Sequence, residues 1–233
     1  MTEVMLRAEG IAKAFTLHLQ GGVVIPVLRG VDLVVRAGEC VALAGASGAG
    51  KSTLMRSLHG NYGVDAGHIL VRHEGMMVDL AAAAPRVVLD VRRRTVGYVS
   101  QFLRTVPRVA AADVVAEAAI DRGMGARAAR GAATAVLERL GIAPRLHGVA
   151  PATFSGGEQQ RVNLARGFIA GHPVLLLDEP TASLDPARVA VVVGMIREAK
   201  ARGAAIVGIF HDAAVRAAVA DATLDIPSIQ DAA

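Results

Sequence analysis

A glycine-rich segment with the sequence GASGAGKS has the residue types needed to hold phosphate groups. It fits the pattern G-x-x-x-x-G-K-[ST] between an apolar strand and a helix. Gly45, Gly48 and Gly50 leave the backbone bare, so its N–H groups can surround phosphate oxygens at the start of the helix. Lys51, one of only three lysines, adds a compact charge toward the β- and γ-phosphates, and Ser52 can place a hydroxyl on Mg²⁺.

Two acidic residues end a second apolar run, VLLLDE. Four apolar residues predict a buried strand, and ligands of such sheets bind beyond the carboxyl ends of the strands. Asp178 would hold Mg²⁺ mainly through its water shell, and Glu179 would polarise an attacking water. The alternative is a strand that simply ends at an acidic helix cap. The presence of a phosphate loop in the same chain disfavours this alternative.

A third segment, FSGGEQQR, combines a helix start with two bare positions. Ser155 and Glu158 have the S-x-x-E spacing of a capping box, which by itself explains both residues. Gly156 and Gly157 are not explained by capping. Two glycines at a helix start make a second anion-binding surface, far from the first in sequence.

A parallel sheet with helices on both faces would position these segments, because strand and helix patterns alternate along the chain. Strands are expected at 4–8, 23–28, 31–35, 39–44, 68–72, 76–80, 95–100, 174–178 and 205–210. Helices are expected at 51–58, 110–120, 127–140, 155–170, 186–202 and 212–220. The Ala-rich stretch 102–150 is predicted to be a helical insertion in an α/β domain that spans 1–233, with the core at 1–101 and 151–233.

Composition excludes several classes of protein. The 233 residues are 53% hydrophobic, yet no stretch approaches the roughly 18–20 uninterrupted apolar residues of a membrane span. The chain is therefore expected to have no direct membrane span and no secretion signal, and a cytoplasmic location fits its single cysteine. Twenty-five basic against 21 acidic residues, with only 3% aromatic, disfavour a nucleic-acid partner.

The Ser-Gly-Gly-Glu-Gln segment resembles the signature sequence of ATP-binding-cassette (ABC) ATPases, and the likeness covers essentially the whole chain. The resemblance implies the P-loop ABC fold, with a mixed, mainly parallel sheet, an N-terminal antiparallel β subdomain and an inserted helical subdomain. It implies an enzyme that hydrolyses ATP to ADP and phosphate with Mg²⁺. The signature helix of one subunit would contact the γ-phosphate bound to the other.

Further roles follow from the resemblance alone. Phe15 would stack on adenine, with a core Phe as the alternative, and Gln101 would touch Mg²⁺ and the attacking water, with a polar strand end as the alternative. Asp185 would lie in the loop that crosses the dimer interface, and His211 would contact the γ-phosphate. The expected catalytic residues are Glu179, His211 and Gln101, and the expected metal site is Ser52, Gln101 and Asp178. The expected nucleotide-binding residues are Phe15, Gly45, Ser47, Gly48, Ala49, Gly50, Lys51, Ser52, Thr53, Ser155, Gly156, Gly157 and Asp185.

Segments that lie partly outside the general motifs, among them 100–104 and 201–212, are similar to the ATP-binding proteins of bacterial carbon–phosphorus lyase systems, the PhnL type. This similarity predicts a partner in the soluble C–P lyase core complex and a role in phosphonate degradation. The alternative is the ATPase subunit of a membrane transporter of the lipoprotein-release or macrolide-export type, which shares every nucleotide motif. A regulatory module that turns over rarely is a further possibility. The second ABC subunit could be an identical chain or a sister ATPase.

Overall fold

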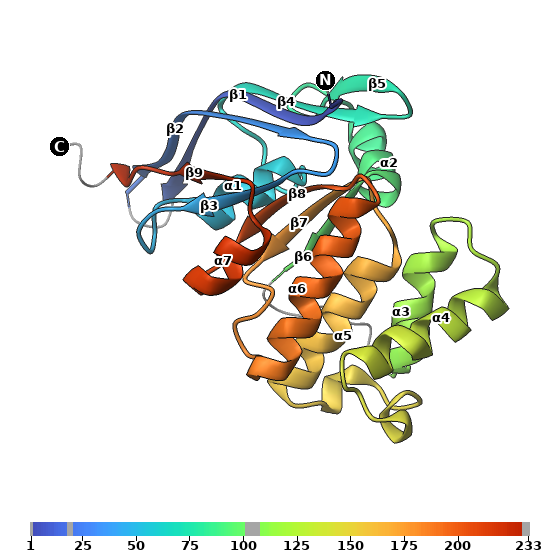
Figure 1. Ribbon diagram of the computed structural model, residues 1–233. Helices are drawn as coiled ribbons and strands as arrows, with labels where there is room; N and C mark the ends of the chain where they lie inside the picture. The colour runs from blue at the N-terminus through green and yellow to red at the C-terminus, as the bar shows by residue number, and fades with distance from the viewer. Residues whose placement is uncertain (1, 18–20, 101–107, 230–233) are drawn as a thin grey trace.

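The computed structural model describes residues 2–17, 21–100 and 108–229, which form two sheets and a layer of helices (Figure 1). One sheet is antiparallel, with the order β2-β1-β4-β5, and the other has the order β6-β7-β8-β3-β9 with all its described pairs parallel. The strands are β1 (Val4–Leu17), β2 (Val23–Arg36), β3 (Cys40–Ala44), β4 (Ala66–His73), β5 (Met76–Asp79), β6 (Val96–Val99), β7 (Val174–Asp178), β8 (Ala205–Ile209) and β9 (Ala222–Asp225).

Seven α-helices occur among the described residues, and most begin and end within two residues of the predicted bounds. They are α1 (Lys51–Leu58), α2 (Pro85–Arg94), α3 (Ala111–Ile120), α4 (Ala126–Arg139), α5 (Gly156–Ile169), α6 (Pro186–Ala201) and α7 (Ala213–Val219). None of the helices in the described ranges has both the length and the apolar character needed to cross a bilayer.

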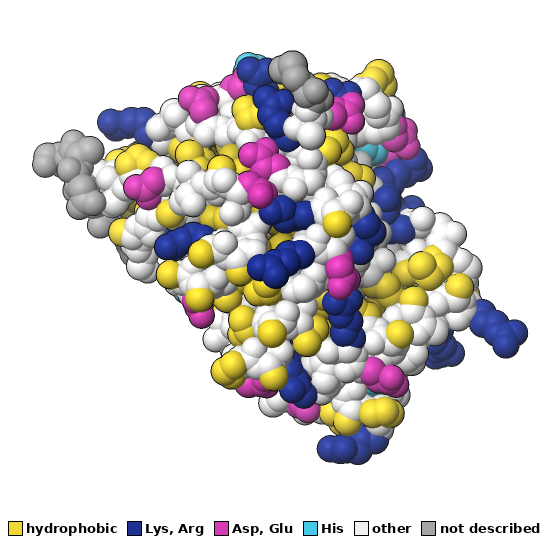
Figure 2. All heavy atoms as spheres, viewed as in Figure 1, with side chains coloured by type: hydrophobic (Ala, Val, Ile, Leu, Met, Phe, Trp, Pro, Cys, Tyr) yellow, Lys and Arg dark blue, Asp and Glu magenta, His cyan; other side chains and the backbone are white. Residues whose placement is uncertain are grey.

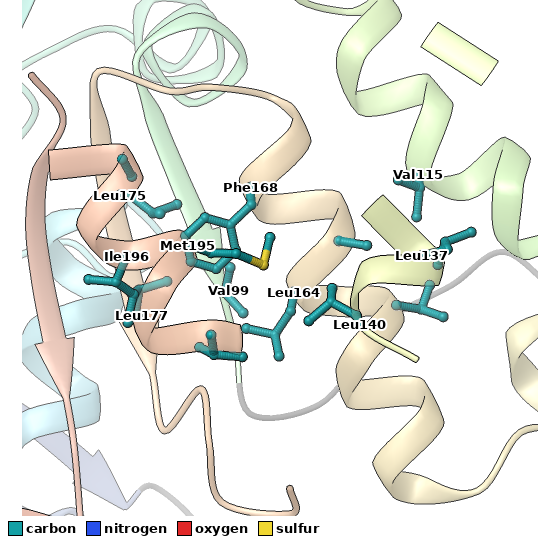
Figure 3. Close-up of a cluster of buried hydrophobic side chains, with 14 of the residues drawn as sticks. Val99, Val115, Leu137, Leu140, Leu164, Phe168, Leu175, Leu177, Met195 and Ile196 are labelled. Atoms are coloured by element: carbon teal, nitrogen blue, oxygen red, sulfur yellow. The ribbon is translucent and has the colours of Figure 1, made fainter. Parts of the chain in front are cut away.

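The parallel sheet separates two hydrophobic cores, because successive side chains of a strand point to opposite faces. Leu175 and Leu177 of β7 belong to the core beneath α5 and α6, which Figure 3 shows extending through Leu164 to α3 and α4. Leu176, between them, belongs to the other core, where the sheet packs against α1 and the antiparallel sheet. Both faces of β7 are therefore covered, as its unbroken apolar sequence requires.

The antiparallel sheet departs from the prediction in the length of its strands. We expected Gly30 to separate two short strands, but β2 continues through it with a φ of 64°. The register with β1 shifts on both sides of Ile11, the partner of Val31, so the irregularity is absorbed as a bulge. Gly21 and Gly22 do form the turn between β1 and β2, as expected.

Two elements were not predicted. Helix α2 starts at Pro85 after an alanine run, and Ala84 at its N-cap gives no side-chain capping bond. Strand β9 is a four-residue edge strand with mostly exposed side chains, beside β3. Helix α2 has Pro85 at its first position and arginines in its last turn, signals that the prediction overlooked, whereas β9 is too short and exposed to have a strand pattern. On the face drawn in Figure 2, basic and acidic side chains are interspersed.

Candidate active site

Three strands of the parallel sheet bring the predicted site residues to one edge. Strand β3 ends at Ala44 and leads into the phosphate loop, β7 ends at Asp178, and β8 ends two residues before His211. These strands are neighbours in the order β7-β8-β3 and run parallel. Their carboxyl ends therefore meet at a common edge, which is where such sheets bind ligands.

The three glycines of the phosphate loop adopt left-handed backbone angles, with φ of 124° at Gly45, 82° at Gly48 and 94° at Gly50. A Cβ on Gly45 would lie 2.4 Å from the carbonyl oxygen of Ile226, and one on Gly50 would lie 2.8 Å from that of Val27. A Cβ on Gly48 would meet no described atom within 4 Å. Packing therefore requires glycine at the first and last positions, whereas Gly48 borders open space that a ligand can approach.

Lys51 lies at the first position of α1, and its side chain reaches back to the start of the phosphate loop. Its Nζ donates hydrogen bonds to the carbonyl oxygens of Gly45 and Ala46, at 2.7 Å each. The ammonium group is thereby held over the loop at the positive end of the α1 dipole, where phosphate oxygens are favoured. Ala49 is buried, while Ser47 is exposed and Thr53 half-buried.

Ser52 and Asp178, the two described residues of the predicted metal site, are in contact. The Ser52 hydroxyl donates to Oδ1 of Asp178 at 3.4 Å, and the Tyr98 hydroxyl donates to Oδ2 at 2.8 Å. Burial raises the pKa of Asp178, and the hydrogen bond from Tyr98 opposes that shift. A hydroxyl and a carboxylate are hard oxygen donors, so this pair fits Mg²⁺.

The structure also brings Glu179 and His211 together. Nε2 of His211 lies 2.6 Å from Oε1 of Glu179, and both residues line a cavity of about 400 Å³ with Leu184 and Asp212. Glu179 has a φ of 53°, and its N–H donates to the carbonyl oxygen of Ile209 at 3.2 Å. A non-glycine residue with that φ is strained, and such strain concentrates at functional sites.

Phe15 lies outside both hydrophobic cores, contrary to the alternative of a core phenylalanine. It is half-buried on β1, and its ring meets that of Tyr62 edge-on at 5.4 Å between centroids. Nζ of Lys13 lies 5.4 Å from the centre of the Phe15 ring. The ring therefore has neighbours that hold it in place near the surface, and its adenine role stays a prediction.

The second glycine pair starts α5, and the predicted capping box is confirmed. The Ser155 hydroxyl accepts from the N–H of Glu158, and the Ser155 N–H donates to Oε2 of Glu158 at 2.9 Å. Ser155 and Gly156 are exposed, and a Cβ on Gly156 would meet no described atom within 4 Å. Among the described residues, no hydrogen bond or ion pair joins this helix start to the phosphate loop of the same chain.

Asp185 stands apart from this geometry. Asp185 is the N-cap of α6, where its Oδ1 accepts from the N–H of Arg188 at 3.0 Å. Gln101 lies outside the described residues, so its proposed contacts with Mg²⁺ and water stay predictions. Sequence reasoning missed Tyr98, although it is one of only two tyrosines and lies three residues before Gln101.

The chain belongs to the ABC transporter family, whose sequence model matches residues 28–182. The family and the P-loop fold confirm the predicted ABC ATPase, an ATP-hydrolysing enzyme. The lipoprotein-releasing system ATP-binding protein LolD of Ruegeria pomeroyi is 43% identical over 80% of this chain and 79% of that protein. The macrolide export ATP-binding/permease protein MacB of Nitrobacter winogradskyi is 37% identical over 94% of this chain. The chain spans about a third of the length of its MacB relatives, and it covers 33% of the Nitrobacter winogradskyi protein.

Solved structures show the same fold. A dimer of the ATP-binding cassette MJ0796, in a post-hydrolysis state bound to ADP and Pi, superposes with a TM-score of 0.85 over 97% of both chains, at 23% identity. An ATP-binding subunit of an ABC transporter superposes with a TM-score of 0.80 at 26% identity, over 95% of this chain and 85% of that one. These likenesses confirm the predicted combination of antiparallel sheet, parallel sheet and helical region.

Proposed function

We propose that this chain is the ATPase component of a membrane transporter of the lipoprotein-release or macrolide-export type. The observation that carries the proposal is the 43% identity to a lipoprotein-releasing ATP-binding protein along 79% of that protein's length. Identity along most of a dedicated ATPase subunit includes surfaces outside the nucleotide motifs. The MacB relatives, in which an ATP-binding region and a permease share one chain, support the same assignment.

The predicted partnership with a C–P lyase complex is less well supported. The relatives reported above are named for export or release, and none is named for phosphonate chemistry. They favour the transporter alternative over the PhnL-type prediction. ATP binding and hydrolysis are common to both assignments. The two differ in the partner protein to which ATP hydrolysis is coupled.

Within the site, we assign each residue the role that its contacts support. The phosphate loop and Lys51 hold the β- and γ-phosphates, and Ser52 with Asp178 hold Mg²⁺, which when bound neutralises charge that develops on the phosphates. Glu179 orients and polarises the attacking water. His211, 2.6 Å from Glu179, is placed to sense the γ-phosphate. Phe15 offers its ring to the base.

The exposed helix start at Ser155–Gly157 completes the site of a second copy. Its glycines and N–H groups can receive an anion, and within the described ranges no hydrogen bond or ion pair joins them to the phosphate loop of their own chain. The dimeric fold relatives provide a precedent for such pairing. ATP would hold two chains together by its γ-phosphate, and hydrolysis would release them.

Affinity purification of the tagged chain from detergent-solubilised membranes of its native source tests the transporter assignment. We expect a permease with transmembrane helices to co-purify, more strongly in the presence of ATP. A matched purification from the soluble fraction is the control. Recovery of phosphonate enzymes without any permease would overturn the proposal and favour the C–P lyase partner.

A further inference from the structure

The carboxylate of Asp178 is fixed at both oxygens by residues from different elements. Ser52 of α1 contacts Oδ1 at 3.4 Å, and Tyr98 of β6 donates to Oδ2 at 2.8 Å. Asp178 itself is buried, with an exposed fraction of 4%. A carboxylate held on two sides in a buried site has little freedom to rotate, so its orientation is set before a metal arrives.

The parallel pairing of β6 and β7 explains why Tyr98 reaches Asp178. Tyr98 is the register partner of Leu176, and paired residues of neighbouring strands point to the same face of the sheet. Asp178 lies two residues beyond Leu176, so its side chain is on that face as well. Tyr98 is long enough to pass along the strand and meet the carboxylate.

Helix α1 holds Tyr98 from the other side. Arg56, one turn after Ser52 on the same helix face, interacts with the Tyr98 hydroxyl and also donates to the hydroxyl of Tyr62 at 2.8 Å. The ring of His59, a further turn along, lies 5.2 Å from the Tyr98 ring. A tyrosine hydroxyl has one proton, and Tyr98 gives it to Oδ2 of Asp178.

We propose that Tyr98 is a positioning residue of the Mg²⁺ site, whose hydroxyl holds Oδ2 of Asp178 so that Oδ1 stays beside Ser52. The inference rests on the metal role proposed above for Asp178 and is independent of the transporter assignment. Residues that hydrogen-bond a metal-binding carboxylate tune its affinity, and their loss costs about 10–100-fold.

Binding of Mn²⁺, a paramagnetic substitute for Mg²⁺, tests the proposal without any turnover. Free Mn²⁺ is measured by electron paramagnetic resonance as it is titrated into the full chain with saturating ADP. The variants are Tyr98→Phe, which removes one hydroxyl, and Asp178→Asn. Tyr62→Phe is the matched control, because it removes the hydroxyl of the only other tyrosine. ADP affinity in EDTA and the melting temperature are measured on every variant.

We expect Tyr98→Phe to weaken Mn²⁺ binding by about 10-fold or more, with ADP affinity in EDTA unchanged. Tyr62→Phe should bind Mn²⁺ like the unmodified chain. Unchanged Mn²⁺ affinity in Tyr98→Phe, with loss of binding in Asp178→Asn, would overturn the role of Tyr98 alone. Unchanged affinity in Asp178→Asn would overturn the proposed metal site as well. Equal weakening of ADP in EDTA and of Mn²⁺ by Tyr98→Phe would show a purely structural role and also reject the proposal.

Discussion

The phosphate loop and the start of α5 are both glycine-bearing helix N-termini, but their surroundings differ. Around the loop, Lys51, Ser52 and Asp178 converge from neighbouring elements, and Gly45 is enclosed by backbone. At the start of α5, Gly156 borders open space, and the hydrogen bonds that Ser155 makes within the described part of the chain are to its own helix. A helix N-terminus attracts an anion, but converging groups from other elements are what position that anion for chemistry. The first region has those elements in its own chain, and in the function proposed above the second receives them from another chain.

The largest effect is expected from Glu179→Gln at the enclosed region. The amide cannot polarise the attacking water, so ATP hydrolysis should fall by about 10²–10⁴-fold. Because ATP still binds, the variant should accumulate as a dimer in ATP, which size-exclusion chromatography measures. Glu198→Gln is the control, because Glu198 is an exposed carboxylate of α6 that pairs with Arg139 of α4. This variant should behave like the unmodified chain. A Glu179→Gln chain that stays monomeric in ATP would contradict the account.

The substitution Gly156→Asp changes the exposed start of α5 and should leave the fold of its own chain intact. Its Cβ would meet no described atom within 4 Å, so the monomer should fold and bind ATP normally. The added charge repels the γ-phosphate of the second copy, and hydrolysis should fall by about 10²-fold. Gly131→Asp, at an open position in α4, is the matched control. Loss of ATP binding by the Gly156→Asp monomer would show that this helix start serves its own chain.

A pair of loop variants separates packing from ligand approach. Gly45→Ala forces a Cβ to within 2.4 Å of the Ile226 carbonyl oxygen, so the free energy of unfolding should fall by about 1–3 kcal/mol. Gly48→Ala has no such neighbour and should cost about 1 kcal/mol through its φ of 82° alone. Urea unfolding measures both. Equal losses would mean that the two glycines serve the same purpose.

The pH dependence of stability should have opposite signs in the two regions. Hydrogen bonds from Ser155 lower the pKa of Glu158, so its stabilising contribution is present above its unfolded pKa of 4.5 and is lost as pH falls through the folded value. Burial raises the pKa of Asp178, so its ionisation opposes folding as pH rises through the folded value.

Two substitutions test these signs by urea unfolding across pH 3–7. Asp178→Asn should raise the free energy of unfolding at pH 7, and the gain should vanish in acid. Glu158→Gln should lower it at pH 7 and have less effect in acid. Parallel pH profiles for the two variants would contradict the assignment of opposite shifts.

Much of this site could be predicted because its signals are local in sequence. A loop of fixed spacing, an apolar strand that ends in Asp178 and a capping box each depend on residues a few positions apart. Helix α2 has a weaker signal, since Pro85 starts it but Ala84 cannot cap it, and β9 depends on β3 for its pairing. The contact between Tyr98 and Asp178 could not be predicted, since it depends on which strands are neighbours and on their register. The identity of the partner depends on surface residues that no local pattern marks.

Complementation between two inactive variants tests the central claim most directly, namely that each ATP is held by the phosphate loop of one chain and the α5 start of another. Lys51→Ala and Gly156→Asp chains are purified separately and then mixed, and ATP hydrolysis is measured. Each mixed dimer has one composite site in which both halves are unmodified, so we predict that activity returns on mixing. Two preparations that stay as inactive together as apart would contradict the claim.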